Sequence, residues 1–211
     1  MSAFGKPLIL LLILLFADGV VAHAKKGIFD DAYGHVGASL HTYTGSLNSS
    51  LSGGNSGYGV QLTLGAGDDW LAVMSKLKFE YSVGLAYFED TTSSQMSYQL
   101  TSTTMGLGIR LNPIPVKHRD NFHIYLGGTM DFGFVSLQLP PSSSYTKLHS
   151  SEAAMEYGYS ALLGVEAGFG KKGKSLNRLY VEGQFRNNHA KLAGKTAFAL
   201  SGFTLSVGLA W

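Results

Sequence analysis

Most of the chain alternates between apolar residues and polar or small residues with a period of two, and this pattern limits what the chain can fold into. In KLKFEYSVGLAYF, residues 76–88, every second residue from Leu77 to Tyr87 is apolar. The segment GFTLSVGLAW, residues 202–211, repeats the pattern. Successive side chains of a strand point to opposite faces, so the alternation predicts β-strands with one apolar face and one polar face.

Similar segments recur along the chain and are separated by breaks rich in Gly, Pro, Asn, Asp and Ser, the residues of turns. Because proline cannot donate to a strand ladder, its confinement to these breaks and to position 7 fits this division. The stretch DDWLAVMSKL, residues 68–77, alone suggests a short helical turn, at a membrane surface. Eight segments are expected to be strands: 33–43, 57–65, 76–89, 97–111, 121–138, 153–169, 177–187 and 197–211.

The two faces of these strands differ in a way that favours a membrane protein. The apolar faces are large and aromatic-rich toward the segment ends, whereas the opposite faces carry Gly, small polar residues and a few charges. Ordinary strands have about five or six residues, and about 9–11 tilted residues cross a bilayer. We therefore expect an all-β, eight-stranded antiparallel up-and-down transmembrane barrel, apolar outside and polar inside. Its interfacial girdles are expected to include Tyr33, Tyr43, Tyr58, Tyr87, Tyr98, Tyr157 and Tyr159.

The first residues have the features of an export signal. Lys6 precedes the apolar run LILLLILLF, residues 8–16, and Ala22 and Ala24 form a small-residue cleavage site. The apolar run is too short to span a bilayer. We expect cleavage after Ala24, so that residues 1–24 are a signal peptide and residues 25–211 form the barrel. The absence of cysteine excludes a lipoprotein anchor and a thiolate metal site.

With its signal segment and its last strand, LSGFTLSVGLAW, the chain resembles the small eight-stranded outer-membrane barrels, the group of outer-membrane proteins A, X and W and the opacity-type porins. In this group a terminal alternation ending in an aromatic residue is read by the barrel assembly machinery, so that machinery is an implied partner. Trp211 replaces the usual terminal phenylalanine. The residues that match the signal are Phe203, Leu205, Val207, Leu209 and Trp211.

The resemblance also implies an orientation and an outer-membrane location. With Trp211 at the periplasmic rim, external loops are expected near 44–56, 90–96, 139–152 and 188–196. Periplasmic turns are expected near 66–75, 112–120 and 170–176.

Charged residues on the polar faces form the candidate site. Unpaired charge in a narrow barrel is costly, so these side chains are expected to pair, with Glu80 and Arg110 low on neighbouring strands. Glu166, Arg178 and Glu182 are expected to cluster low on the sixth and seventh strands, 153–169 and 177–187. The network either plugs the barrel or lines a narrow polar pore. Its inward residues are Lys78, Glu80, Arg110, His123, Asp131, Glu156, Glu166, Arg178, Glu182 and Arg186.

The stretch GFGKKGKS, residues 168–175, matches the phosphate-binding loop pattern, but the residues after it alternate as a strand instead of a helix. We therefore interpret it as a hairpin turn and expect no nucleotide. The net charge of +2 is too small to indicate nucleic acid. His35 and His41 share a strand face at about 20 Å and cannot share a metal ion. No metal or other cofactor is expected.

The expected role is structural or surface-interacting, in contact with outer-membrane lipid. Lys147, His149, Lys191 and Lys195 are candidate contacts for lipopolysaccharide phosphates. One alternative is a narrow porin-like channel for small or hydrophobic solutes. Another is a lipid A-modifying enzyme; the deacylases in this group carry a His-x-Ser-Asn motif, whereas here FRNNHAK places Ala190 and Lys191 after His189, without the serine. A soluble periplasmic barrel is a further alternative.

Overall fold

The computed structural model describes most of the region expected to form the barrel. The signal segment 1–24, Tyr87, Lys147, His149 and Lys195 lie outside the described residues, and no described helix has the length and hydropathy that a membrane crossing requires. The described residues are 32–44, 51–52, 56–67, 70–86, 96–113, 122–138, 151–169, 177–191 and 198–211. The long strands are β1 (Tyr33–Tyr43), β3 (Ser56–Gly67), β4 (Leu71–Ala86), β5 (Met96–Leu111), β6 (Phe122–Gln138), β7 (Ser151–Phe169), β8 (Asn177–Ala190) and β10 (Gly202–Ala210); β2 (Leu51–Ser52) and β9 (Phe198–Ala199) are short.

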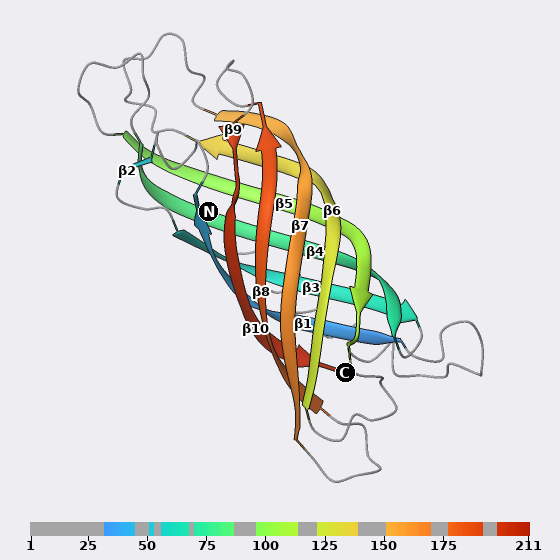
Figure 1. The fold of residues 1–211 in the computed structure, drawn as a ribbon. Helices are drawn as coiled ribbons and strands as arrows, with labels where there is room; N and C mark the ends of the chain where they lie inside the picture. Colours follow the sequence, from blue (N-terminus) through green and yellow to red (C-terminus); the bar gives the residue numbers. More distant parts are fainter. Residues whose placement is uncertain are drawn as a thin grey trace, which may run out of the picture. The chain divides into compact units, whose positions relative to one another are not determined.

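The long strands form a closed antiparallel barrel (Figure 1). Each pairs with the next long strand along the chain, and β10 pairs with both β8 and β1. The register at this closing seam aligns Leu40 with Leu205, and Gly37 with Gly208. The expected all-β, eight-stranded antiparallel barrel is therefore confirmed. Closure satisfies the strand edges that an open sheet would leave unpaired.

The barrel is apolar outside and polar inside. Phe79 and Leu205 are 46% and 55% exposed on the outer surface. The next residue after Phe79, Glu80, is 3% exposed, and Glu182 is 1% exposed. A barrel folded for water would bury the first pair and expose the second. The strand parity deduced from the alternation is thus the parity that the structure has.

The expected helical turn at residues 68–77 is wrong, because β4 begins at Leu71. Trp70, Leu71 and Val73 are exposed on the outside, and Ala72 and Met74 are buried inside. The same short apolar run satisfies both a helical and an alternating pattern, and pairing with β3 and β5 selects the strand. The expected turn at 66–75 is accordingly shorter, lying between the end of β3 and the start of β4.

Three tyrosines expected in the interfacial girdles point into the barrel instead: Tyr33, whose ring centroid is 4.4 Å from the Arg110 guanidinium in the lumen, Tyr43 and Tyr98. Tyr43 and Tyr98 are each 2% exposed. Tyr43 has the same strand parity as His41, which places it inside despite its position at a strand end. Tyr58, Tyr157 and Tyr159, by contrast, are exposed on the outer surface.

The hairpin and the end of the chain also differ in detail from the expected segments. The stretch that matches the phosphate-loop pattern begins in the last two residues of β7 and is followed by β8, which starts at Asn177 and pairs with β7 in antiparallel fashion. A strand therefore occupies the position where a nucleotide-binding loop would have a helix. β8 continues to Ala190, and the expected last strand is divided into β9 and β10. Leu200 lies at this division and is buried. The side chains of Phe203, Leu205, Val207 and Leu209 are exposed on the outer face, and Trp211 pairs through its backbone with Gly34.

Candidate functional site

The lumen contains charged side chains from opposite walls of the barrel, arranged in layers along its length. Five cationic side chains and five carboxylates are described there, so the charges balance with histidine neutral. An eight-stranded barrel has an interior just wide enough for side chains. The cationic residues are Lys76, Lys78, Arg110, Arg178 and Arg186, and the acidic residues are Glu80, Asp131, Glu156, Glu166 and Glu182.

The layer nearest the expected periplasmic turns is centred on Glu166. Its carboxylate accepts hydrogen bonds from Arg110 Nη2 at 2.6 Å and from Arg178 Nη1 at 3.2 Å. His35 Nε2 lies 3.0 Å from the same carboxylate. The Arg110 guanidinium also lies over the ring of Tyr125, 3.9 Å from its centroid. This buried carboxylate is therefore shared by three basic side chains.

Arg110 also connects this layer to β6. Its Nε donates to Asn112 Oδ1 at 3.0 Å, and His123 Nε2 lies at 3.0 Å from the same oxygen. His35 stacks on the ring of Tyr180 at a centroid distance of 4.6 Å. The Arg110 guanidinium thus combines an ion pair with Glu166, a hydrogen bond to Asn112 and a contact with the ring of Tyr125. Lysine could not provide this combination.

The middle layer contains two separate ion pairs. Lys76 pairs with Glu182, which also accepts a hydrogen bond from Tyr125 Oη at 3.2 Å. Lys78 Nζ lies 3.1 Å from Asp131 Oδ2, and Asp131 also accepts a hydrogen bond from Thr129. Lys76, which is 0% exposed, was not among the expected site residues. Lys76 has the same strand parity as Lys78, and this parity is the signal that could have identified it. Because Lys76 is the first residue of the expected strand 76–89, it was not assigned to either face.

The third layer lies toward the expected external loops. Arg186 pairs with Glu80, and His41 Nδ1 is 3.9 Å from the same carboxylate. Beyond them, the buried Glu156 accepts hydrogen bonds from Ser102 Oγ at 2.6 Å and Asn188 Nδ2 at 2.7 Å. Its partners within the described chain are neutral. Glu156 is therefore held by hydrogen bonds rather than by a close cation.

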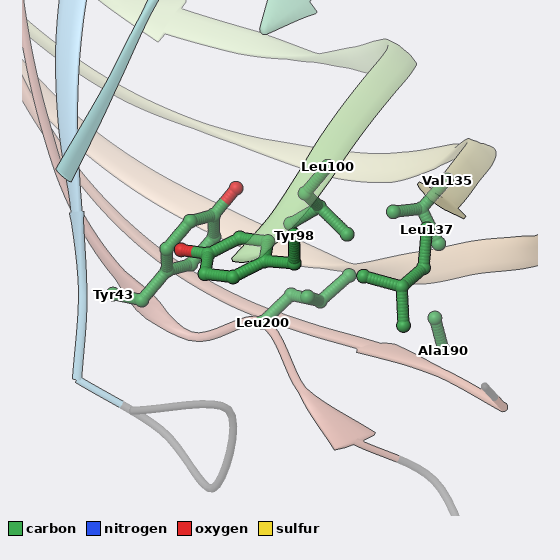
Figure 2. Packing of buried hydrophobic residues seen from close by; sticks show 7 residues of the cluster. All are labelled: Tyr43, Tyr98, Leu100, Val135, Leu137, Ala190 and Leu200. Atoms are coloured by element: carbon green, nitrogen blue, oxygen red, sulfur yellow. The ribbon is translucent and has the colours of Figure 1, made fainter. Parts of the chain in front are cut away.

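An apolar layer follows on the loop side of these charges; we call it the apolar cap. Its side chains come from β1, β5, β6, the end of β8 and the connection between β9 and β10, and they are at most 4% exposed (Figure 2). In the figure, Tyr98, Leu100 and Leu200 lie between Tyr43 and the pair formed by Val135 and Leu137. The cap consists of Tyr43, Tyr98, Leu100, Val135, Leu137, Ala190 and Leu200.

The expected network residues all lie in the lumen, with Arg178 the most exposed at 18%. The structure does not pair Glu80 with Arg110; each pairs with a partner on another strand, Arg186 and Glu166 respectively. Glu166 and Arg178 are in contact, whereas Glu182 pairs with Lys76.

The expected separation of the two histidines is also seen, since His35 contacts Glu166 and His41 contacts Ser82. Among the described residues, no group of His, Cys, Asp and Glu could hold a metal ion.

Comparisons with known proteins support the fold. No protein-family model matches the sequence, and no curated protein matches it. The crystal structure of Neisserial surface protein A, NspA, is similar with a TM-score of 0.53 and 15% identity, over 85% of this chain and 95% of that one. At this identity the likeness establishes the fold, and the expected resemblance to small eight-stranded outer-membrane barrels is confirmed at that level.

Two structures of Ail from Yersinia pestis also align with the chain. The crystal structure of this attachment invasion locus protein has a TM-score of 0.38 and 11% identity, over 85% of this chain and 97% of that one. The backbone structure of Ail in a phospholipid bilayer nanodisc has a TM-score of 0.36 and 13% identity, over 84% and 99%. These TM-scores are too low to add to the comparison with NspA.

Proposed function

We propose that this chain is an outer-membrane protein of the Gram-negative envelope whose filled barrel has a structural role and carries surface-interacting loops. The supporting observation is the combination of an apolar outer wall with a lumen of paired charges. In hydrocarbon, every backbone polar group must be satisfied internally, and only helices and closed barrels achieve this. The exposed apolar wall would be an aggregation hazard in water, whereas lipid covers it at no such cost.

A filled lumen favours a barrel that does not conduct. The three charged layers place cations and carboxylates from non-neighbouring strands in direct contact. The apolar cap adds a second obstacle, because a hydrophobic constriction excludes ions by excluding water. Opening a path would require both separating buried ion pairs and displacing cap residues such as Leu100 and Leu137.

The test is single-channel recording with the full chain reconstituted in planar bilayers, after confirming that it fractionates with the outer membrane and shows heat-modifiable gel mobility. We expect no discrete conductance steps. A matched preparation of Arg186→Ala, which removes the cation of the loop-side layer, shows how far the other charged layers and the cap block ions without it. Reproducible steps from the unmodified protein would favour the narrow porin-like channel instead.

The proposed role does not include lipid A modification. His189, the nearest approach to the deacylase pattern, packs with its ring 6.3 Å from that of Tyr157 on the outer wall. Ala190 follows it in the apolar cap. We expect mass spectrometry of lipid A to give the same species with and without expression of the chain. New or missing acyl groups would identify an enzyme.

A further inference from the structure

The outer wall of the barrel is interrupted by a groove of about 530 Å³ where β1, β10, β8 and β7 adjoin. Its floor is at Gly183, whose missing side chain leaves space between Leu163 and Leu205, the residues opposite it on the neighbouring strands. Phe185 and Phe203 form one rim, with ring centroids 5.2 Å apart. Apart from Thr42, the outward-facing residues of its lining are apolar; Leu162, Gln184 and Thr204, which are buried, also border it.

A polar group of side chains, which we call the ledge, continues this wall on the loop side of the groove. Asn187 Nδ2 donates to Tyr159 Oη at 2.9 Å, and Ser201 Oγ donates to Asn187 Oδ1 at 2.6 Å. The next outward residue of β8 is His189, beside Tyr157, and the exposed Lys191 follows. Phe185 and Lys191 are six residues apart, which is about 20 Å along a strand.

Strands β7, β8 and β10 lie side by side (Figure 1). On them the apolar groove is followed by the polar ledge, which ends in the cation of Lys191. The groups of an amphipathic lipid follow the same order along the molecule: an apolar acyl chain, a polar linkage and a charged head group. Hydrogen-bonding side chains and lysine are suitable ligands for phosphate oxygens. The ledge is also at the end of the hydrocarbon-facing wall, where aromatic residues meet the head-group region.

We propose that this wall binds one phosphorylated lipid of the loop-side leaflet, with an acyl chain in the Gly183 groove and the phosphate at the ledge beside His189 and Lys191. The inference depends on the proposed membrane location. A second copy of the chain fits the groove less well, because a two-fold contact would place groove against groove. A flexible acyl chain can fill the groove through van der Waals contacts, which drive association within a membrane.

The test uses the full chain in phosphatidylcholine vesicles that contain lipid A with a photoreactive group on an acyl chain. After illumination, mass spectrometry locates the crosslinked peptides. We expect more crosslinks on β8 and β10 than on the opposite wall, which is formed by β4 and β5. Equal crosslinking around the barrel would overturn the inference, but the chain would still have inserted into the membrane as the proposed function requires. Failure of the chain to insert would instead refute the proposed function.

The groove is tested by Gly183→Leu. A Cβ at Gly183 would meet only the Leu163 carbonyl oxygen at 3.9 Å, so the new side chain enters the groove without displacing the wall. We expect the preference for β8 and β10 to fall to the level of the opposite wall. The matched control is Thr101→Leu, an exposed outward position on β5, which should leave the preference unchanged. An unchanged preference in Gly183→Leu, or crosslinks between two copies at the groove, would overturn the inference.

The ledge is tested by Lys191→Glu. Losing one lysine near an anionic lipid surface costs about fivefold in binding, and the new carboxylate also repels the phosphate, so we expect lipid A capture to weaken by more than about fivefold. Lys117→Glu, which lies between β5 and β6 in the sequence, is the control of equal charge and should not change capture. Dephosphorylated lipid A should bind the unmodified protein as weakly as lipid A binds Lys191→Glu. Inorganic phosphate should not compete, because the acyl chain contributes to binding; equal capture of both lipids, or competition by phosphate, would contradict the proposal.

Discussion

Arg186 and Arg110 are both buried cations, but their carboxylate partners differ in how many other basic groups they contact. Removing Arg186 leaves Glu80 with His41 Nδ1 at 3.9 Å as its remaining close basic group in the described lumen. Glu166 without Arg110 keeps Arg178 and His35. We expect Arg186→Met to lower the free energy of unfolding by about 3–5 kcal/mol, the cost of a buried charge that loses its partner, and Arg110→Met to cost less.

Urea unfolding in matched lipid or detergent measures these differences. Gln184→Met is the control, because Gln184 is on the same lumen face as Arg186 and its amide has no hydrogen-bond partner among the described residues. It should change stability by less than about 1 kcal/mol. Equal losses for Arg186→Met and Gln184→Met would show that the ion pair is not what stabilises this layer.

At this scale the sequence identifies which side chains enter the lumen but not which of them pair. Parity along a strand is local information, and it predicts Glu80 and Arg186 as inward residues. Their pairing joins β4 to β8, which are separated by three strands on either side of the barrel. Such contacts depend on closure and shear, so the sequence alone suggested Arg110, on the neighbouring strand, as the residue near Glu80.

The individual strand shows how closure depends on the small residues of the seam between β1 and β10. A Cβ at Gly37 would lie 2.4 Å from the Val207 carbonyl oxygen and 2.4 Å from Tyr180 Oη. Because one of these atoms is backbone, the clash cannot be relieved by rotating a side chain. We expect Gly37→Val to separate the seam and to abolish the heat-modifiable mobility of the folded barrel.

The neighbouring Ala38→Val tests whether bulk on β1 is tolerated when it faces outward. Ala38 is exposed on the outer wall, so this variant should keep the mobility shift of the unmodified protein. Gel electrophoresis of unheated samples compares the two. A folded, heat-modifiable Gly37→Val barrel would mean that the seam can accommodate a side chain facing the lumen.

Strand ends were predicted well where turn residues and alternation agree, and poorly where they conflict. β1 was predicted with the bounds it has, Tyr33–Tyr43. β4 begins five residues before the expected position 76, because its first residues also fit a helical period. The closeness of Tyr98 to a strand end suggests a place in a girdle, whereas its parity turns it into the apolar cap. Parity was thus more informative than position along the strand.

For the whole molecule, every proposed role depends on which surface of the barrel meets hydrocarbon. The chain contains no cysteine, so single cysteines report their own surroundings. On β10, Ser206 is 1% exposed in the lumen and Val207 is 53% exposed on the outer wall. We expect Val207→Cys in vesicles to react with a lipid-soluble maleimide but not with a charged, water-soluble one, because its thiol faces acyl chains.

If the lipid-soluble maleimide carries a fluorophore, its emission at Val207→Cys should also be quenched by spin-labelled lipids. Ser206→Cys should react with neither maleimide until the barrel is unfolded. Comparing adjacent residues controls for depth, since both positions are at nearly the same level of the membrane. A soluble periplasmic barrel would leave the Val207→Cys protein outside the vesicles and reactive toward the water-soluble reagent. That result would overturn the outer-membrane role together with the lipid site, because both require an apolar wall in contact with lipid.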